Sequence, residues 1–155
     1  MTLKESGWKL LKDEVREKHF VFDATAFPDG EYVLRITASD SPSNPPDQAL
    51  TASLVSDPFL IDNTPPEIME LTGSESGGKL NVSWTAKDVS SLIDKAEYSV
   101  NGGEWMVVEP TTRLSDAQAL QYRLSLNRPG SGEVTIAVRA TDEYDNQAVR
   151  KVVIR

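Results

Sequence analysis

The chain has 155 residues, of which 39% are hydrophobic and 26% are charged, a balance typical of globular rather than disordered proteins. Its net charge is −8, and both halves are acidic, which argues against nucleic-acid or anionic-membrane partners because these require basic patches. The absence of cysteine excludes disulfides and thiol chemistry, and no apolar run is long enough to span a membrane.

In the first part of the chain, short apolar segments alternate with turns. We expect strands at residues 8–11 and 20–22, separated by a charged turn, and a further turn at 27–30 that contains proline and glycine. A longer strand is expected over residues 30–40. A proline-rich loop then precedes returning strands at 49–55 and 58–61, and Pro65-Pro66 marks a short, stiff linker.

The second part predicts seven strands, separated by turn signals. They are expected at residues 68–71, 79–86, 96–100, 105–108, 120–126, 132–142 and 149–154. Asn101-Gly102 is the strongest of the hairpin signals, and Gly77-Gly78 and Pro129-Gly130 mark further turns. Leu80, Val82, Trp84 and Ala86 are predicted to point into the core, and one helical turn is expected near residues 115–117.

Residues 30–40 and 132–142 repeat one alternating pattern, 102 positions apart and without a gap. The predicted inward residues are Tyr32, Leu34, Ile36 and Ala38 in the first copy and Val134, Ile136, Val138 and Ala140 in the second. Such strand number and spacing are typical of an immunoglobulin-like sandwich. We therefore predict an all-β chain in which one kind of β module occurs twice, over residues 1–64 and 65–155.

The first module is expected to be incomplete. Nothing before Trp8 corresponds to residues 68–100 of the second module, so three strands are absent from a fold that needs about seven. Residues 1–64 would then be the C-terminal strands of a sandwich whose N-terminal strands are missing, whereas residues 65–155 form a complete one. The exposed half-core would need cover from an upstream segment, from another chain by edge-strand pairing, or from a strand-swapped dimer.

Several motifs resemble known families of β-sandwich. The pattern Leu80-x-Val82-x-Trp84 resembles fibronectin type III domains, and Gly30-Glu31-Tyr32 is similar to the tyrosine corner, whose hydroxyl bonds to nearby backbone. Val134 stands at the tyrosine's position in the second module, so that module should lack this corner.

Two further stretches extend the resemblance. Residues 98–105, taken with 139–142 and Asn146, resemble bacterial immunoglobulin-like modules of large exported multidomain proteins. The run from Trp8 to Tyr32 resembles the small sandwich domain that follows β-propellers in two-component sensors. These resemblances imply tandem modules within a larger extracytoplasmic protein, either periplasmic or secreted.

Acidic and amide side chains in the loops and the linker form a candidate calcium site. In this fold the loops after the second and sixth strands lie at the end where the chain enters the module. The candidate ligands are Asp62, Asn63, Asp88, Asp142, Asp145 and Asn146. Calcium requires six to eight oxygen ligands. The alternative, which stays open, is that Asp and Asn bond to their own backbone in turns.

Trp8 and Trp105 are candidates for an aromatic platform that binds carbohydrate, with the alternative that they cover the edge of a sandwich. His19 is the only histidine, so the chain alone cannot form a histidine-based triad or a histidine-rich metal site. Paired carboxylates could support glycosidase chemistry, but the acidic residues fall mostly in loops without an obvious cleft. We therefore expect no enzyme, no catalytic residues and no cofactor other than the candidate calcium.

The sequence thus predicts a non-catalytic structural or interaction module that acts as a rigid spacer or presentation unit in a larger bacterial protein. The alternatives are a carbohydrate- or protein-binding accessory domain and the extracytoplasmic relay domain of a propeller-type sensor. The expected partners are adjacent domains of the parent chain and a polysaccharide or protein, without nucleic-acid binding or membrane insertion.

Overall fold

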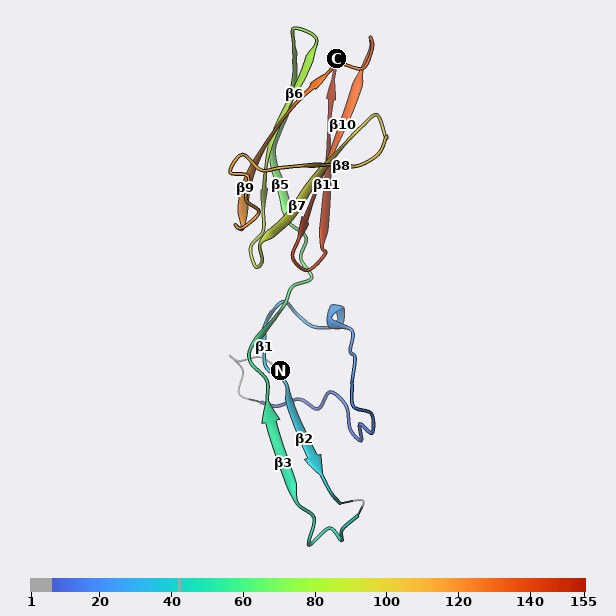
Figure 1. The fold of residues 1–155 in the computed structure, drawn as a ribbon, viewed down its shortest axis with the longest axis vertical. Coiled ribbons are helices and arrows are strands. Elements are labelled where there is room, and N and C mark those ends of the chain that lie inside the picture. Colours follow the sequence, from blue (N-terminus) through green and yellow to red (C-terminus); the bar gives the residue numbers. More distant parts are fainter. Residues whose placement is uncertain (1–6, 42) are drawn as a thin grey trace. The chain divides into compact units, whose positions relative to one another are not determined.

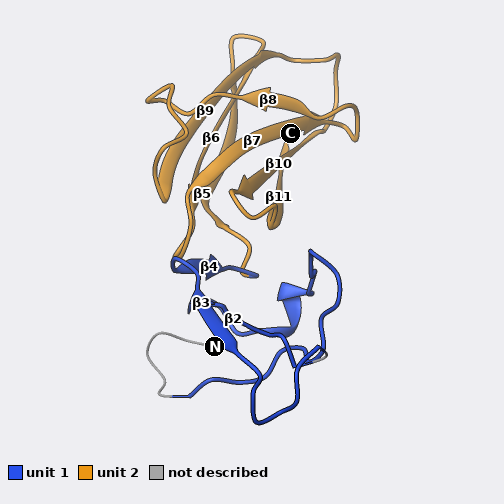
Figure 2. Ribbon diagram, turned by 60° about the horizontal axis from the view of Figure 1, so that its bottom comes forward, with its two compact units in different colours: residues 1–63 blue, residues 64–155 orange. Residues whose placement is uncertain are grey.

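The computed structural model describes residues 7–41 and 43–155 and divides into two compact units, Met1–Asn63 and Thr64–Arg155 (Figure 2). In the described residues all strands pair antiparallel, and the single helical element is a short 3-10 helix, η1 (Ala24–Ala26). No helix in this part of the chain is long and apolar enough to cross a membrane. The predicted all-β class is confirmed.

Unit 2 consists of two antiparallel sheets (Figure 1). One sheet has the order β5-β6-β9 and contains β5 (Glu67–Ser76), β6 (Lys79–Lys87) and β9 (Ala119–Asn127). The other has the order β11-β10-β7-β8 and contains β7 (Ile93–Val100), β8 (Met106–Val108), β10 (Val134–Asp142) and β11 (Gln147–Ile154). Each strand overlaps one predicted from the sequence, because the turn residues between strands set their ends.

Alternate side chains of facing strands fill the core of unit 2, as the sequence predicted. In β6 and β10 these are Leu80, Val82, Trp84, Ala86, Val134, Ile136, Val138 and Ala140, each at most 2% exposed. The Trp84 ring stacks on that of Tyr122 at a centroid distance of 5.2 Å and an interplanar angle of 12°. Such aromatic burial contributes strongly to stability because each ring removes a large apolar area from water.

The Asn101-Gly102 turn between β7 and β8 has the predicted hairpin geometry. Both residues have positive φ, +51° and +75°, and the Gly103 N–H donates to the Val100 carbonyl at 2.9 Å. Two successive left-handed residues match the right-handed twist of the flanking strands. The turn signal in the sequence was therefore sufficient to place this hairpin.

The first and last strands of unit 2 lie side by side although they belong to different sheets. The Arg150 guanidinium in β11 donates to the Ile68 carbonyl in β5 at 2.8 Å. Further along both strands, a Cβ on Gly73 would lie only 2.9 Å from Cδ1 of Ile154, so only glycine leaves room for that side chain. Because residue numbers rise together, β5 and β11 are parallel, and the chain enters and leaves unit 2 at opposite ends (Figure 1).

Unit 1 contains four short strands in its described residues. β1 (Gly30–Tyr32) pairs with β4 (Phe59–Ile61), and β2 (Arg35–Ser39) pairs with β3 (Thr51–Val55). The strand predicted over residues 30–40 is therefore broken between β1 and β2. At the break, the Leu34 N–H donates to the Ser56 hydroxyl at 2.9 Å instead of to a ladder carbonyl.

For unit 1 the prediction that alternate residues of this strand face a core is largely wrong. Tyr32 is buried, but Ile36 is 62% exposed, and every residue of β2 and β3 is exposed. Alternation of apolar residues sets which side chains share a face, but burial requires a second layer to cover that face. The described part of unit 1 places no such layer over β2 and β3.

The strands predicted at residues 8–11 and 20–22 do not form, and neither does the helical turn near 115–117. A strand requires a neighbouring strand to pair its backbone groups, and the described residues supply none to either segment. Phe22 instead joins a chain of ring contacts through Phe27 and Tyr32 to Phe59, with centroid distances of 5.5, 6.1 and 6.3 Å. Aromatic packing thus replaces strand pairing here.

The predicted tyrosine corner is confirmed in unit 1. The Tyr32 hydroxyl donates to the Pro28 carbonyl at 2.7 Å, which ties β1 to the preceding turn. In unit 2, Val134 occupies the corresponding position and is buried in the core. The partial character of unit 1 and the tandem immunoglobulin-like arrangement stay predictions.

Candidate functional site

Two loops at one end of unit 2, after β6 and after β10, lie against each other. The Glu143 N–H donates to the Leu92 carbonyl at 3.1 Å, and the Leu92 N–H donates to Glu143 Oε2 at 3.4 Å. The chain order of the sandwich dictates this meeting, because both loops follow strands that run toward the same end. The acidic residues at the start of the two loops are therefore neighbours, as the sequence predicted.

Asp88 immediately follows β6 and is 2% exposed. Its Oδ1 accepts hydrogen bonds from the backbone N–H groups of Ser90 and Ser91, both at 2.8 Å, in the manner of an Asx turn. Its Oδ2 is also buried and has no hydrogen-bond partner among the described residues. One oxygen of this carboxylate thus shapes the loop, and the other is left unsatisfied.

Asp142 ends β10 and is 1% exposed. Its Oδ1 accepts the N–H groups of Tyr144 and Asn146 at 2.8 and 2.9 Å, and its Oδ2 accepts the Asn146 side-chain amide at 2.9 Å. The loop between β10 and β11 therefore wraps around this carboxylate. For Asp142 and Asn146 the structure thus shows the hydrogen bonds expected if these residues only shape their own turn.

Carboxylate oxygens of Asp88 and Asp142 lie within 4.8 Å of each other. Within the described chain, neither carboxylate forms an ion pair with a basic side chain. Two negative charges 4.8 Å apart repel by about 3–4 kcal/mol at an effective dielectric constant near 20, and closer charges repel more strongly. The pair is therefore electrostatically unfavourable unless a positive charge accompanies it.

The other predicted ligands in unit 2 are placed differently. Asp145 is exposed and has a φ of +65°, and its N–H donates to the Asp142 carbonyl at 3.2 Å, so it forms part of the turn. Asn146 contacts the site through its bonds to Asp142. Asp88 and Asp142 are thus the two buried carboxylates that unit 2 brings together.

Asp62 and Asn63 belong to unit 1, where they follow β4. The Asn63 side-chain amide donates to the carbonyls of Ala24 and Phe27 at 3.2 and 3.1 Å, and its N–H donates to Asp29 Oδ1 at 2.9 Å. Asn63 therefore fixes the loop around η1. The expectation that Asp62 and Asn63 bind an ion stays a prediction.

Each predicted ligand-binding tryptophan lies under an arginine. The Arg139 guanidinium sits 4.3 Å from the ring centre of Trp105 and is held by Glu97 at 2.7 Å. In unit 1 the Arg35 guanidinium lies 4.1 Å from the ring centre of Trp8. A guanidinium thus covers one face of each indole. Carbohydrate binding and covering the edge of a sandwich both stay predictions for these tryptophans. Neither arginine was predicted from the sequence to contact a tryptophan, although each occupies an alternate position of a predicted strand.

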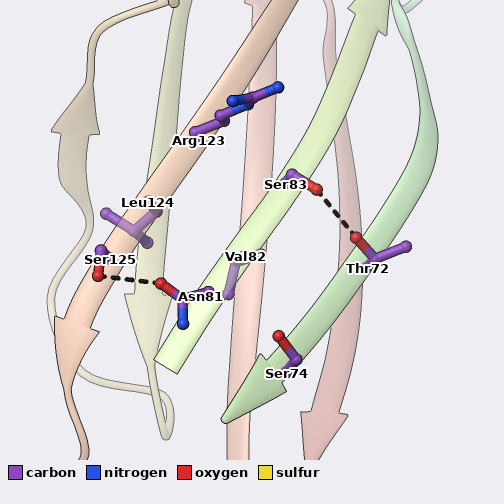
Figure 3. A pocket seen from close by; sticks show the side chains of 8 residues that line it. All are labelled: Thr72, Ser74, Asn81, Val82, Ser83, Arg123, Leu124 and Ser125. Atoms are coloured by element: carbon purple, nitrogen blue, oxygen red, sulfur yellow. Dashed lines mark hydrogen bonds between the residues drawn. The ribbon is translucent and has the colours of Figure 1, made fainter. Parts of the chain in front are cut away.

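A shallow hollow of about 480 Å³ lies on the outer face of the β5-β6-β9 sheet (Figure 3). It is lined by Thr72, Ser74, Asn81, Val82, Ser83, Arg123, Leu124 and Ser125. The hydroxyls of Thr72 and Ser83 bond to each other at 2.9 Å, and the Ser125 hydroxyl donates to Asn81 Oδ1 at 3.1 Å. These four side chains thus form hydrogen bonds with one another between neighbouring strands.

His19 lies in an exposed segment, as expected, and its Nε2 is 3.6 Å from Glu17 Oε2. Both side chains are exposed to solvent, so the contact contributes little to stability.

No protein-family model and no curated protein matches the sequence. Among the solved structures that match is the sulfane dehydrogenase SoxCD from Paracoccus pantotrophus, with 25% sequence identity and a TM-score of 0.39. The match covers 45% of this chain and 18% of the SoxCD chain, so the matched part is far less than two thirds of the SoxCD chain. A likeness of this extent assigns neither a family nor an activity to the chain.

Proposed function

We propose that the chain is a non-catalytic structural module, a rigid spacer or presentation unit in a larger bacterial protein. The observation that carries this proposal is the parallel packing of the first and last strands of unit 2, with the chain entering and leaving at opposite ends (Figure 1). A unit connected in this way extends the distance between whatever precedes and follows it.

The same arrangement suits a unit that bears tension. A pull on the two ends acts along β5 and β11 and slides them past each other. The bond from Arg150 to Ile68 and the packing of Ile154 against Gly73 then resist the pull together. β5 has ten residues, and its two contacts with β11, at Ile68 and Gly73, lie five residues apart, about 16 Å along an extended strand.

Two further observations support the proposal. The interior of unit 2 is filled by a contiguous apolar cluster. The three-plus-four strand order agrees with the resemblance of Leu80-x-Val82-x-Trp84 to fibronectin type III sandwiches. The resemblance also motivates the extracytoplasmic location that we include in the proposal. A carbohydrate-binding role and a sensor relay are the alternatives, and the arginine-covered tryptophans disfavour the first.

The spacer role can be tested by pulling single molecules in two directions. The chain contains no cysteine, so pairs of introduced cysteines give unique attachment points. Pro66→Cys with Arg155→Cys loads β5 and β11 along their length, whereas Glu133→Cys with Arg155→Cys unzips the antiparallel pair that begins at Val134 and Ile154. We expect a clearly higher unfolding force for the first pair. An equal or lower force would contradict a tension-bearing spacer.

As a second role, we propose that unit 1 pairs with a second copy of the chain through the edge of β2. Ile36 and Leu54 lie directly opposite each other in the β2–β3 pair and are 62% and 75% exposed. In the described residues β2 has β3 as its single neighbour, whereas its counterpart β10 lies between β7 and β11. An uncovered edge beside exposed apolar side chains is a template for pairing with an identical edge.

Sedimentation over a range of protein concentrations tests this second role. We expect a reversible dimer for the natural chain and a monomer for Ile36→Lys, because the added charge would be buried at the paired edge. Val107→Lys, an equally exposed apolar position in unit 2, serves as the control and should still dimerise. A natural chain that stays monomeric at high concentration would rule out self-pairing.

A further inference from the structure

The buried carboxylates of Asp88 and Asp142 carry an inference that is independent of the spacer role. Both residues are almost fully buried, at 2% and 1% exposed, and their oxygens lie within 4.8 Å of each other. Acidic side chains are rarely buried without a compensating charge. Among the described residues no lysine or arginine supplies that charge.

Turn formation accounts for three of the four oxygens but not for the last one. Asp88 Oδ1 and both oxygens of Asp142 accept hydrogen bonds from their own loops. Asp88 Oδ2 is buried without a partner. If Asp88 served only its turn, a neutral asparagine would supply the same Oδ1 acceptor and would avoid the repulsion from Asp142. The unpartnered, buried oxygen therefore indicates a missing positive ligand.

We propose that Asp88 and Asp142 bind a calcium ion between the loops that follow β6 and β10. Calcium holds oxygen ligands at about 2.3–2.6 Å, so two of its ligands lie no more than about 5 Å apart. The limit of 4.8 Å between the two carboxylates satisfies this condition. Magnesium, with bonds of about 2.0–2.1 Å and a strict octahedral preference, suits such loop-borne oxygens less well.

The bound ion neutralises the repulsion between the carboxylates and fastens the two loops to each other. It also gives Asp88 Oδ2 the partner that it lacks. Water and nearby backbone carbonyls complete the coordination, as is usual where the protein supplies few carboxylates. The loops then bind the ion with oxygens that their turns have already positioned, which lowers the cost of ordering them.

Calorimetric titration and thermal melting of the full chain, first stripped with EDTA, test the site with calcium alone. We expect one calcium per chain and a rise in the melting temperature on the order of 10 °C once calcium reaches about one hundred times its Kd. Asp88→Asn keeps the acceptor for Ser90 and Ser91 but removes the anionic oxygen, so this variant should fold and should bind no calcium.

Asp145→Asn is the matched control, because Asp145 is an exposed acid of the same loop and asparagine tolerates its positive φ. It should keep both the binding heat and the melting shift. Four results would overturn the proposal: no calcium binding by the natural chain, an unchanged shift in Asp88→Asn, loss of the shift in Asp145→Asn, or magnesium binding as tight as that of calcium. The calorimetry of the natural chain decides the matter even if a variant fails to fold.

Discussion

The aligned strands of the two units share one sequence pattern but have different surroundings. In unit 2, β10 has a hydrogen-bonded neighbour on each side, and its inner residues are sealed under the β5-β6-β9 sheet. In unit 1, β2 pairs with β3 alone, and all of its residues are exposed. An alternating strand therefore specifies which residues share a face, whereas the opposing layer determines whether that face is buried.

The same substitution in each strand gives the largest contrast. Ile136→Ala removes a fully buried side chain and should lower the free energy of unfolding of unit 2 by about 2–5 kcal/mol. In solutions dilute enough for the chain to be monomeric, Ile36→Ala, at an exposed position, should change the stability of unit 1 by less than about 0.5 kcal/mol. Hydrogen exchange measures both because it resolves the units residue by residue. Equal losses would show that Ile36 is buried in solution.

A second contrast concerns glycine. Gly73→Ala places a Cβ 2.9 Å from Ile154 and 3.2 Å from Val152, so it should destabilise unit 2 by about 1–3 kcal/mol in urea unfolding. Gly7→Ala, where nothing lies within 4 Å, is the control in unit 1 and should be neutral. Shortening the neighbour with Ile154→Val should recover part of the loss. A neutral Gly73→Ala would refute the close packing of β5 and β11.

Alkaline pH should weaken unit 2 through Tyr122. Burial raises the pKa of Tyr122 to about 12 from the ordinary value of 10, so the unfolded chain releases this proton first. The contribution of the protonated Tyr122 hydroxyl to the free energy of unfolding is therefore complete below pH 10 and is lost as the pH rises through about 12. Melting temperatures over this range should fall less steeply for Tyr122→Phe than for the natural chain, and the exposed control Tyr144→Phe should follow the natural chain.

The smallest effect is expected at the tyrosine corner of unit 1. Tyr32→Phe removes the bond to the Pro28 carbonyl and should cost about 0.5–1.5 kcal/mol in unit 1. Hydrogen exchange of β1 and β4 should quicken, while that of unit 2 stays unchanged. Faster exchange in unit 2 as well would mean that the corner stabilises more than its own unit.

The sequence predicted the strands of unit 2 well because local signals and burial agree there. Asn101-Gly102 fixed a hairpin, and the alternation at Leu80, Val82 and Trp84 matched a covered face. The same reasoning failed at residues 8–11 and 20–22, where apolar residues have no strand to pair with in the described chain. Pairing partners come from distant segments, so local composition cannot reveal their absence.

The candidate site was predictable in part. Chain order and loop position were enough to bring Asp88 and Asp142 together. Which acids are buried was not predictable, because Asp142 and Asp145 belong to one loop, yet the first is enclosed by the backbone and the second faces solvent. The arginines over Trp8 and Trp105 were also missed, since such stacking depends on side chains from separate segments.

The three tryptophans differ in environment, so their intrinsic fluorescence can be used to follow the opening of the chain. Trp84 is enclosed by the core beside Tyr122, so its emission should be blue-shifted and should move to longer wavelength when unit 2 opens. Trp8 is already 44% exposed, and its emission should respond mainly to separation from the Arg35 guanidinium. Trp105 in unit 2 is 37% exposed and also lies under an arginine, so Trp105→Phe would remove this overlapping signal. In that variant, emission wavelength and intensity would report the two units separately, without any attached dye.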